Sequence, residues 1–449
     1  MMGVEADKLL SYLPGGKGFD LPFAEIREAQ VVAMDERLRE QGERIKVVAM
    51  RAKDAGLSCI DSREDAVSLL LPHTAYKSYP ESFLMEEKWD KLTRWLSTVS
   101  SHPTDDTDLR EIAGIDEWIV RLQDAGHYVS CSSGTTGKSA MLISSAADIA
   151  HGSRDLVNAV TWGADVEDNQ SRRFFSTGAV AAVPKNIALG AGLFQAFART
   201  DVMPFISPAP PMTVGSITGA IVMRKRIADG IATPSEIAAF EATAAERQQA
   251  MTDAVVAVTD AIIEAREDEL FLMGMWAGHY QVAKAVRDRG YSAKDFNPRN
   301  ALFCSGGLKR AQLPDDYRSF VYETFNISPE RTFLSYGMQE IQSNMPQCSH
   351  GRYHIPPWLV CLPLNEEGDA LLHADQGQIE ARAAFFDLSM EGRWGGVISG
   401  DRIEVDFGAC ACGHASPSIA DTISRYADIK GDDKIGCAGT VDAYVRGLN

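Results

Sequence analysis

The sequence lacks long hydrophobic runs, a basic N-terminal leader and an excess of positive charge. Its longest apolar stretches, residues 254–258 and 383–386, are far shorter than the roughly 18 residues that a membrane-spanning helix needs. Residues 1–20 show no basic start followed by an apolar core, so we expect no secretory signal. Acidic residues outnumber basic ones by 62 to 44, a formal net charge of −18, which argues against a nucleic-acid-binding surface. We therefore expect a cytoplasmic protein that binds neither nucleic acid nor a membrane.

Cysteine is also scarce, because the 449 residues include only eight, too few for a disulfide scaffold. Five of them lie from Cys348 onward, and in a cytosolic chain this distribution suggests free thiols or metal ligands. The composition is otherwise ordinary, with 45% hydrophobic and 24% charged residues, as in soluble globular proteins. The length allows one large body, or two to three units of about 150 residues each.

The pattern of apolar residues changes along the chain and predicts an α/β fold. Residues 23–51 and 86–99 have helical spacing with charged opposite faces. Residues 235–270 are rich in Ala and Glu and predict a further helix, with Ser235 as its cap. The later part of the chain is richer in strands. The predicted strands are residues 127–131, 141–144, 301–305, 332–335, 359–362, 370–373, 396–399 and 402–407.

The most informative stretch is a loop of small residues that ends in a lysine. A β-rich run leads into it, and two threonines separate its two glycines, whereas the common P-loop has four residues there. Glycine lets the backbone approach an anion, hydroxyls add donors, and lysine adds a compact positive charge. The alternative is a flexible linker, which does not usually end a β-run with a lone lysine. The loop therefore predicts a phosphate-binding site formed by Ser132, Ser133, Gly134, Thr135, Thr136, Gly137 and Lys138.

This loop resembles the signature of the adenylate-forming superfamily, which includes acyl-CoA synthetases, peptide-synthetase adenylation domains and luciferases. Three further segments follow in that superfamily's order, namely residues 304–307 (CSGG), 335–340 (SYGMQE) and 399–401 (SGD). The Cys-x-Cys-Gly element at residues 410–413 makes the phenylacetate-CoA ligase-like subgroup the most similar. The resemblance implies an α/β body of two mixed sheets flanked by helices, plus a small β-rich subdomain. It also implies ATP-dependent joining of a carboxylic acid to AMP, with release of pyrophosphate.

The resemblance implies a role for each motif residue. Glu340 would bind Mg²⁺ and Lys138 would hold the leaving pyrophosphate, so both are candidate catalytic residues. Tyr336 would stack on the adenine, Asp401 would accept both ribose hydroxyls, and Arg425 falls where the family has a hinge arginine. Taken alone, Tyr336 is also typical of a strand-end turn and Asp401 of a β-turn. The remaining nucleotide-contacting candidates are Ser305, Gly306, Gly307, Gly337, Met338 and Gln339.

The chain departs from the family pattern in two places. Gln339 stands where the family usually has Thr or Ser; its amide still donates to a phosphate, but its longer side chain changes the site. The chain ends at Asn449, so we expect the family's mobile C-terminal domain, a unit of roughly a hundred residues, to be absent. We then expect the acyl-adenylate to pass to a reductase, an amine or a carrier protein. Short members of the subgroup act in antibiotic biosynthesis and other secondary metabolism.

Cysteine and histidine pairs on two loops predict a structural zinc site. Cys348 and His354 follow the glutamate motif, and Cys410 and Cys412 follow the aspartate motif. These residue types suit tetrahedral Zn²⁺, and the two loops lie close together if the fold resemblance holds. His350 and His414 are rivals of His354 as the fourth ligand. The alternative is four unrelated side chains.

The division of the chain follows from the same resemblance. We expect a helical N-terminal part over residues 1–125, an ATP- and acyl-binding body over 126–355, the β-rich subdomain over 356–430 and a tail over 431–449. The acid is not readable from the sequence, and a homodimer is left open. A non-catalytic nucleotide-binding or partner protein and a complete CoA ligase are the alternative functions. Candidates for the acyl pocket, which equally suit a core, are Phe194, Phe197, Trp276 and His279.

Overall fold

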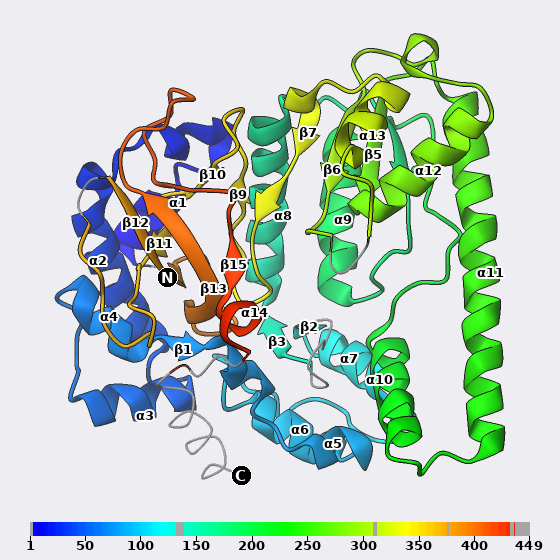
Figure 1. The fold of residues 1–449 in the computed structure, drawn as a ribbon. Coiled ribbons are helices and arrows are strands. Elements are labelled where there is room, and N and C mark those ends of the chain that lie inside the picture. Colours follow the sequence, from blue (N-terminus) through cyan, green and yellow to red (C-terminus); the bar gives the residue numbers. More distant parts are fainter. Residues whose placement is uncertain (1–2, 132–138, 309–311, 375–376, 432–434, 436–449) are drawn as a thin grey trace. The chain divides into compact units, whose positions relative to one another are not determined.

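The computed structural model describes residues 3–131, 139–308, 312–374, 377–431 and 435. The chain divides into two compact units, whose elements Figure 1 labels. Unit 1 contains Met1–Asn158 and Tyr336–Asn449, and unit 2 contains Ala159–Ser335. Helix α8 (Ala146–Ala164) crosses the boundary. Because both terminal parts of the sequence enter unit 1, residues far apart along the chain pair there.

The largest sheet of unit 1 is mixed and has the strand order β10-β14-β13-β12-β11, with β1 and β15 also paired to β13. Only β1 is parallel to its partner. The predicted strands 396–399 and 402–407 are one continuous strand, β13, and residues 370–373 form an isolated bridge instead of a strand. The strands are β1 (Leu71–Pro72), β10 (Tyr353–His354), β11 (Leu359–Cys361), β12 (Gln378–Asp387), β13 (Gly396–Asp406), β14 (Ser418–Ile419) and β15 (Ser424–Arg425).

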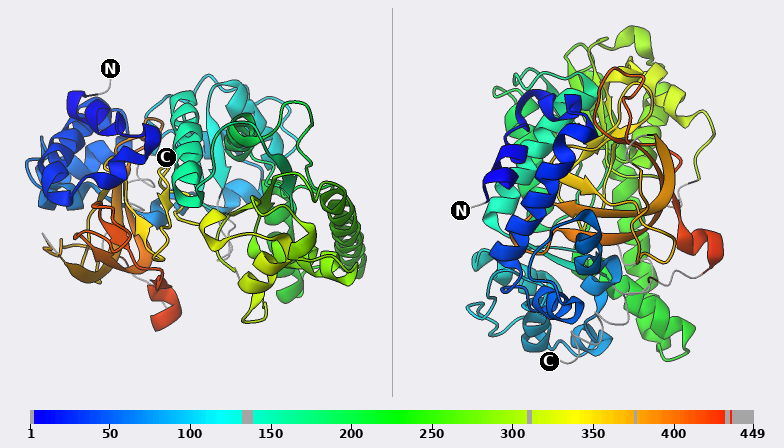
Figure 2. Two further views of the ribbon diagram at one scale, coloured as in Figure 1. Left: turned by 90° about the horizontal axis from the view of Figure 1, so that it is seen from above. Right: turned by 90° about the vertical axis from the view of Figure 1, so that its left-hand side faces the viewer.

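Helices from the N-terminal part of the sequence, drawn in blue, lie beside the strands of this sheet drawn in orange, as both views of Figure 2 show. Polar side chains of α2 fasten it there, because Gln30 donates to Pro357 O and Arg37 to Leu388 O. The predicted helix over 23–51 is two helices, because the backbone is extended at Ile45, where φ is −92° and ψ is 100°. The helices of unit 1 are α1 (Val4–Leu10), α2 (Phe23–Gln41), α3 (Lys46–Ala55), α4 (Arg63–Leu69), α5 (Glu81–Met85), α6 (Trp89–Leu96), α7 (Ile115–Asp124) and α14 (Tyr426–Lys430), with 3₁₀ helices η1 (Pro14–Asp20) and η2 (His73–Lys77).

Two short strand pairs complete unit 1. The antiparallel hairpin of β2 (Tyr128–Cys131) and β3 (Met141–Ser144) confirms the strands predicted on both sides of the loop of small residues. Strand β8 (Ser335–Tyr336), which starts at the boundary between the units, pairs with β9 (Met345–Pro346). The segment that connects β8 to β9 carries Glu340.

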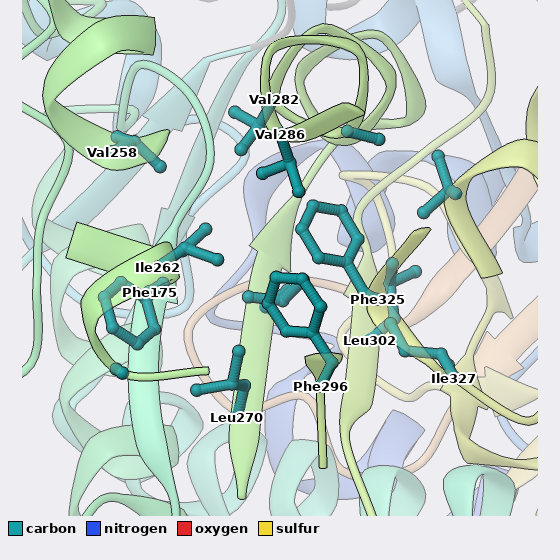
Figure 3. Close-up of a cluster of buried hydrophobic side chains, with 14 of the residues drawn as sticks. Phe175, Val258, Ile262, Leu270, Val282, Val286, Phe296, Leu302, Phe325 and Ile327 are labelled. Atoms are coloured by element: carbon teal, nitrogen blue, oxygen red, sulfur yellow. The ribbon is translucent and has the colours of Figure 1, made fainter. Parts of the chain in front are cut away.

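Unit 2 is a parallel sheet with helical crossovers, in the order β4-β5-β6-β7. Its core gathers β-strand residues and the inner faces of α11, α12 and α13, including Phe175, Leu302 and Phe325 (Figure 3). The elements are β4 (Arg173–Ser176), β5 (Leu270–Gly274), β6 (Ala301–Cys304), β7 (Thr332–Phe333), α9 (Pro184–Phe197), α10 (Val214–Ala228), α11 (Pro234–Glu264), α12 (Trp276–Asp288), α13 (Tyr317–Phe325), η3 (Ala293–Asp295) and η4 (Pro329–Arg331).

The α/β class is confirmed, with a mixed principal sheet in unit 1 and a parallel one in unit 2. The second sheet is parallel because helices follow β4, β5 and β6. These helices return the chain to the end of the sheet at which every strand starts. The long helix α11 is capped by Thr233, whose side chain accepts from the Glu236 amide; the expected cap, Ser235, lies inside the helix. None of the described helices is both long and apolar enough to cross a membrane.

Candidate functional site

Two predicted nucleotide-contacting residues meet in unit 1. The Tyr336 hydroxyl donates a 2.9 Å hydrogen bond to Asp401 Oδ2. Arg425 lies opposite Asp401 in the β13–β15 pair, with its Nε 3.6 Å from Asp401 Oδ1. Burial, followed by the charge of Asp401, raises the pKa of Tyr336 well above its usual value, so the hydroxyl stays protonated and donates. A carboxylate has about four acceptor positions, so Asp401 keeps capacity for ligand hydroxyls.

Glu340 lies in the same unit and is only 9% exposed. Within the described part of the chain, no donor reaches its carboxylate. The carboxylate is therefore available to a bound cation. Carboxylate oxygen is a ligand that Mg²⁺ prefers, so Glu340 fits the predicted magnesium site. Burial raises the pKa of the neighbouring Tyr76 to about 12, and the charge of Glu340 contributes to this rise.

The predicted phosphate loop, residues 132–138, lies outside the described residues, and Lys138 with it. The strands on both sides of the loop are described. Cys131 pairs with Met141 across the β2–β3 hairpin. The buried Tyr79 donates a 2.7 Å hydrogen bond to the carbonyl of Ser139, the first described residue after the loop. The residues that flank the loop, Cys131 and Ser139, are therefore both held by contacts within unit 1.

The remaining motif residues divide between the two units. Ser305 follows β6 in unit 2, and both its amide and its hydroxyl donate to Gly274 O, at 2.8 and 3.2 Å. Gly306 has a φ of 79°, which favours glycine. Gly307 follows with an exposed backbone. Because these residues belong to unit 2, their contact with the same nucleotide as Asp401 stays a prediction. Between Tyr336 and Glu340 in unit 1, Gly337 and Gln339 are exposed and Met338 is half-buried.

The four predicted zinc ligands lie together in unit 1. The ligand atoms of Cys348, His354, Cys410 and Cys412 are all within 4.8 Å of one another. Cys348 Sγ is 4.0 Å from Cys410 Sγ, and Cys412 Sγ is 3.3 Å from His354 Nε2. Cys348 and Cys410 each start a tight turn, because Gly351 N donates to Cys348 O and Gly413 N donates to Cys410 O. Three thiols and an imidazole at these distances are the donor set of a closed structural zinc site.

A polar neighbour fixes the orientation of the histidine in this cluster. His354 is fully buried, and its Nδ1 lies 2.8 Å from Ser416 Oγ, which leaves Nε2 facing Cys412. Burial lowers the pKa of His354 to about 4, so the ring is neutral, as a metal ligand must be. Burial and the neighbouring cysteines raise the pKa of Cys412 to about 12, which disfavours thiolates without a cation. The rival His414 instead faces Asp20, with Nδ1 2.7 Å from Oδ1.

The aromatic candidates for an acyl pocket lie in unit 2. Phe197 and His279 are fully buried and Trp276 is 2% exposed. His279 Nε2 is 3.1 Å from Phe303 O, and its Nδ1 is 3.1 Å from Thr177 Oγ1, so both ring nitrogens are engaged inside the unit. Phe194 packs edge-on against Phe174. These contacts favour the alternative that the four residues belong to a core.

The sequence analysis did not identify three buried ionisable residues that bind the main chain near Glu340. Arg393 donates to the carbonyls of Gln339 and Glu340, at 3.0 and 3.1 Å. Asp387 accepts from the amides of residues 342 and 343, and Asp155 accepts from the amide of residue 344. Burial raises the pKa of Asp155 to about 7. The available signal was weak: Asp387 is a charge directly after the apolar run 383–386.

Comparison with known proteins gives distant structural likenesses. No family model and no curated protein matches the chain. Apo MatB from Rhodopseudomonas palustris is similar over 65% of this chain and 46% of its own, with 13% identity and a TM-score of 0.38. The chain therefore spans less than half the length of that protein. The amide bond synthetase McbA from Marinactinospora thermotolerans is similar over 84% of this chain and 72% of its own, with 13% identity and a TM-score of 0.34. An acyl-CoA synthetase (AMP-forming)/AMP-acid ligase II-like protein from Dyadobacter fermentans is similar over 70% and 65%, with 11% identity and a TM-score of 0.33.

Proposed function

We propose that this chain is an ATP-dependent ligase that activates a carboxylic acid as its acyl-adenylate. The observation that carries the proposal is the hydrogen bond from Tyr336 to Asp401, because it joins two of the sequence motifs across 65 positions. Glu340, a largely buried residue whose carboxylate is paired with no described residue, adds support from a third position. Each of the three residues has the chemistry that its motif demands.

The chemistry assigns one task to each group. An oxygen of the substrate carboxylate attacks the α-phosphorus of ATP, the bond from that phosphorus to the bridging oxygen breaks, and pyrophosphate leaves. Asp401 would accept the ribose hydroxyls, and Lys138 with the loop amides would hold the pyrophosphate. Glu340 would hold Mg²⁺, which draws charge off the phosphates when bound. We further propose that the acyl group is transferred to an amine, a reductase or a carrier protein. We also propose that the reaction belongs to secondary metabolism.

A pyrophosphate-release assay tests the proposal. Purified protein is incubated with ATP, Mg²⁺ and a panel of aryl and fatty acids, with hydroxylamine added to trap the activated acyl group as a hydroxamate. We expect acid-dependent pyrophosphate release and a matching hydroxamate. Nucleotide binding without turnover on any acid would instead favour a non-catalytic binding protein. Formation of acyl-CoA by the purified protein alone would favour a complete CoA ligase.

We also propose that Cys348, His354, Cys410 and Cys412 hold one structural zinc ion. The convergence of their ligand atoms supports this, as does the contact of His354 Nδ1 with Ser416, which directs Nε2 toward the thiols. Four protein ligands leave no position for a reacting water, so the ion would join the β10 segment to the turn after β13 and take no part in the chemistry.

Elemental analysis of protein purified without chelator tests the zinc site. We expect close to one zinc per chain, and loss of zinc in Cys410→Ser. Cys59→Ser is the matched control, because Cys59 lies outside the cluster and should leave the zinc content unchanged. Metal-free wild-type protein, with the same thermal stability as Cys410→Ser, would contradict the proposal.

A further inference from the structure

Arg393 is a fully buried arginine whose guanidinium joins two segments of unit 1. Its Nη1 donates to Ile143 O at 2.7 Å and to Ser144 Oγ at 3.2 Å, both on β3. Its Nη2 donates to Gln339 O and Glu340 O, at 3.0 and 3.1 Å. The guanidinium is a planar, rigid fork of donors, so this one side chain fixes the separation and orientation of the two segments.

The backbone around Arg393 is itself held firmly. The amides of Glu391 and Gly392 donate to the two oxygens of the buried Asp148, at 2.7 and 2.8 Å. A Cβ on Gly392 would lie 2.6 Å from Ser145 N, so only glycine fits this close approach to the end of β3. Arg393 therefore starts from a fixed position and cannot shift to follow a displaced Glu340.

Three buried ionisable side chains hold the main chain of the segment between residues 339 and 344. Arg393 binds two of its carbonyls, at residues 339 and 340. Asp387 binds the amides of residues 342 and 343, and Asp155 binds the amide of residue 344. The segment has no regular secondary structure of its own, so these side chains replace the hydrogen bonds that a helix or a sheet would supply. The main chain is fixed, and the Glu340 carboxylate is left for a ligand.

We propose that Arg393 is a positioning residue for the adenylation reaction proposed above. It holds the main chain of Glu340 in register with β3, the strand that follows the loop ending in Lys138. The inference rests on the proposed function, because it concerns the group that would hold the magnesium ion. Arg393 would touch neither ATP nor the acid, and it would act only through the placement of Glu340. A fixed placement matters because a displacement of about 1 Å in a reacting group can cost roughly a hundredfold in rate.

The test compares Arg393→Lys with Arg51→Lys. Lysine keeps the charge of Arg393 but lacks the fork, so it cannot bridge both segments. Arg51 is a matched control: it is 6% exposed, and its Nε and Nη2 both donate to the carbonyl of Ser68, away from every site residue named above. A general loss of stability from a buried lysine should appear in both variants alike. Ser144→Ala is a milder third variant, which removes one acceptor from Nη1.

Two measurements separate positioning from folding. Hydrogen exchange followed by mass spectrometry, on the protein without nucleotide, should show faster exchange in the peptide covering residues 339–344 for Arg393→Lys, and no change there for Arg51→Lys. In the pyrophosphate-release assay, Arg393→Lys should raise the half-saturating Mg²⁺ concentration and lower kcat, each by roughly tenfold, with the KM for ATP within about twofold of wild type. Ser144→Ala should shift both in the same direction by a smaller factor.

The inference fails if Arg393→Lys matches Arg51→Lys in both measurements. If Arg393→Lys does not fold, Ser144→Ala takes its place in the test. The inference then fails if residues 339–344 of Ser144→Ala exchange at the wild-type rate. Failure of the proposed function looks different. In that case the wild-type protein itself releases no pyrophosphate and binds no Mg²⁺–ATP. The exchange result would then show only that Arg393 stabilises the structure of residues 339–344.

Discussion

Tyr336 and Asp401 show how a single hydrogen bond can prepare a binding group. The hydroxyl of Tyr336 occupies one oxygen of Asp401, and Arg425 lies beside the other. The two neighbours contact opposite oxygens of the carboxylate and restrict its rotation. A carboxylate held in this way can accept ligand hydroxyls with little loss of side-chain entropy.

Asp401→Asn should weaken ATP binding. The amide keeps the shape but replaces one acceptor oxygen with a donor, so we expect the Kd for ATP to rise by roughly tenfold, or about 1.4 kcal/mol. Calorimetric titration with ATP and Mg²⁺ measures it. Asp406→Asn, on the same strand β13, is the control and should bind ATP as the wild type does. Equal affinities for all three proteins would rule out Asp401 as a nucleotide contact.

Asp155 should make the stability of the protein depend on pH near neutrality. Its folded-state pKa is about 7 against an ordinary value of 3.8, chiefly because of burial, so the folded chain binds a proton that the unfolded chain has released. Stability should therefore fall as the pH rises from about 4 to about 7, and then level off. Asp155→Asn removes the titrating group. The Tm of this variant, relative to that of the wild type, should therefore increase as the pH rises from about 4 to about 7.

The difference between the Tm–pH curves of wild type and Asp155→Asn isolates this effect from other titrating groups. The exposed Asp288 supplies the control variant Asp288→Asn, which reports the effect of removing a carboxylate from the surface. A flat difference curve for Asp155→Asn would mean that Asp155 is ionised in the folded protein throughout.

At the scale of the element, Glu340 lies on a segment without regular structure, and side chains distant in sequence hold that segment. Local patterns predicted the strands on both sides of residues 132–138, the parallel-sheet strands that end at Cys304 and Phe333, and helices within residues 23–51, 86–99 and 235–270. They could not predict that Arg393 would reach across to Glu340, because that contact joins positions 53 apart and leaves no local periodicity. The cap of α11 was misplaced by two residues, since Thr233 and Ser235 are equally good capping types.

Removal of the proposed zinc ion should loosen particular elements. In the presence of a strong chelator, exchange should quicken in β10, in the turn at residues 408–416 and in β14, because the ion would join these segments. Strands β4, β5 and β6 belong to unit 2 and serve as the internal reference, with unchanged exchange. Uniform loosening of both units, or no change anywhere, would contradict a local structural metal.

At the scale of the whole molecule, the chain forms two α/β units, one of which is assembled from both ends of the sequence. The composition and the strand patterns were enough to predict the class. They were not enough to predict that the β-rich stretch after residue 355 joins β1 from the N-terminal part, since that pairing links Leu71 with Val397. The candidate residues divide in the same way. Tyr336 and Asp401 are hydrogen-bonded within unit 1, which also contains Glu340, whereas Ser305 belongs to unit 2.

The central claim is that a carboxylate oxygen of the substrate attacks the α-phosphorus of ATP, and isotope transfer tests it most directly. Acids labelled with ¹⁸O in the carboxylate, namely benzoate, phenylacetate and octanoate, are turned over with ATP, Mg²⁺ and hydroxylamine. When hydroxylamine displaces AMP from the acyl carbon, one carboxylate oxygen leaves with the phosphate. The account predicts AMP carrying one ¹⁸O atom, with pyrophosphate as the co-product and with loss of the signal in Lys138→Ala. Formation of ADP, unlabelled AMP, or no cleavage of ATP with any of the acids would contradict it.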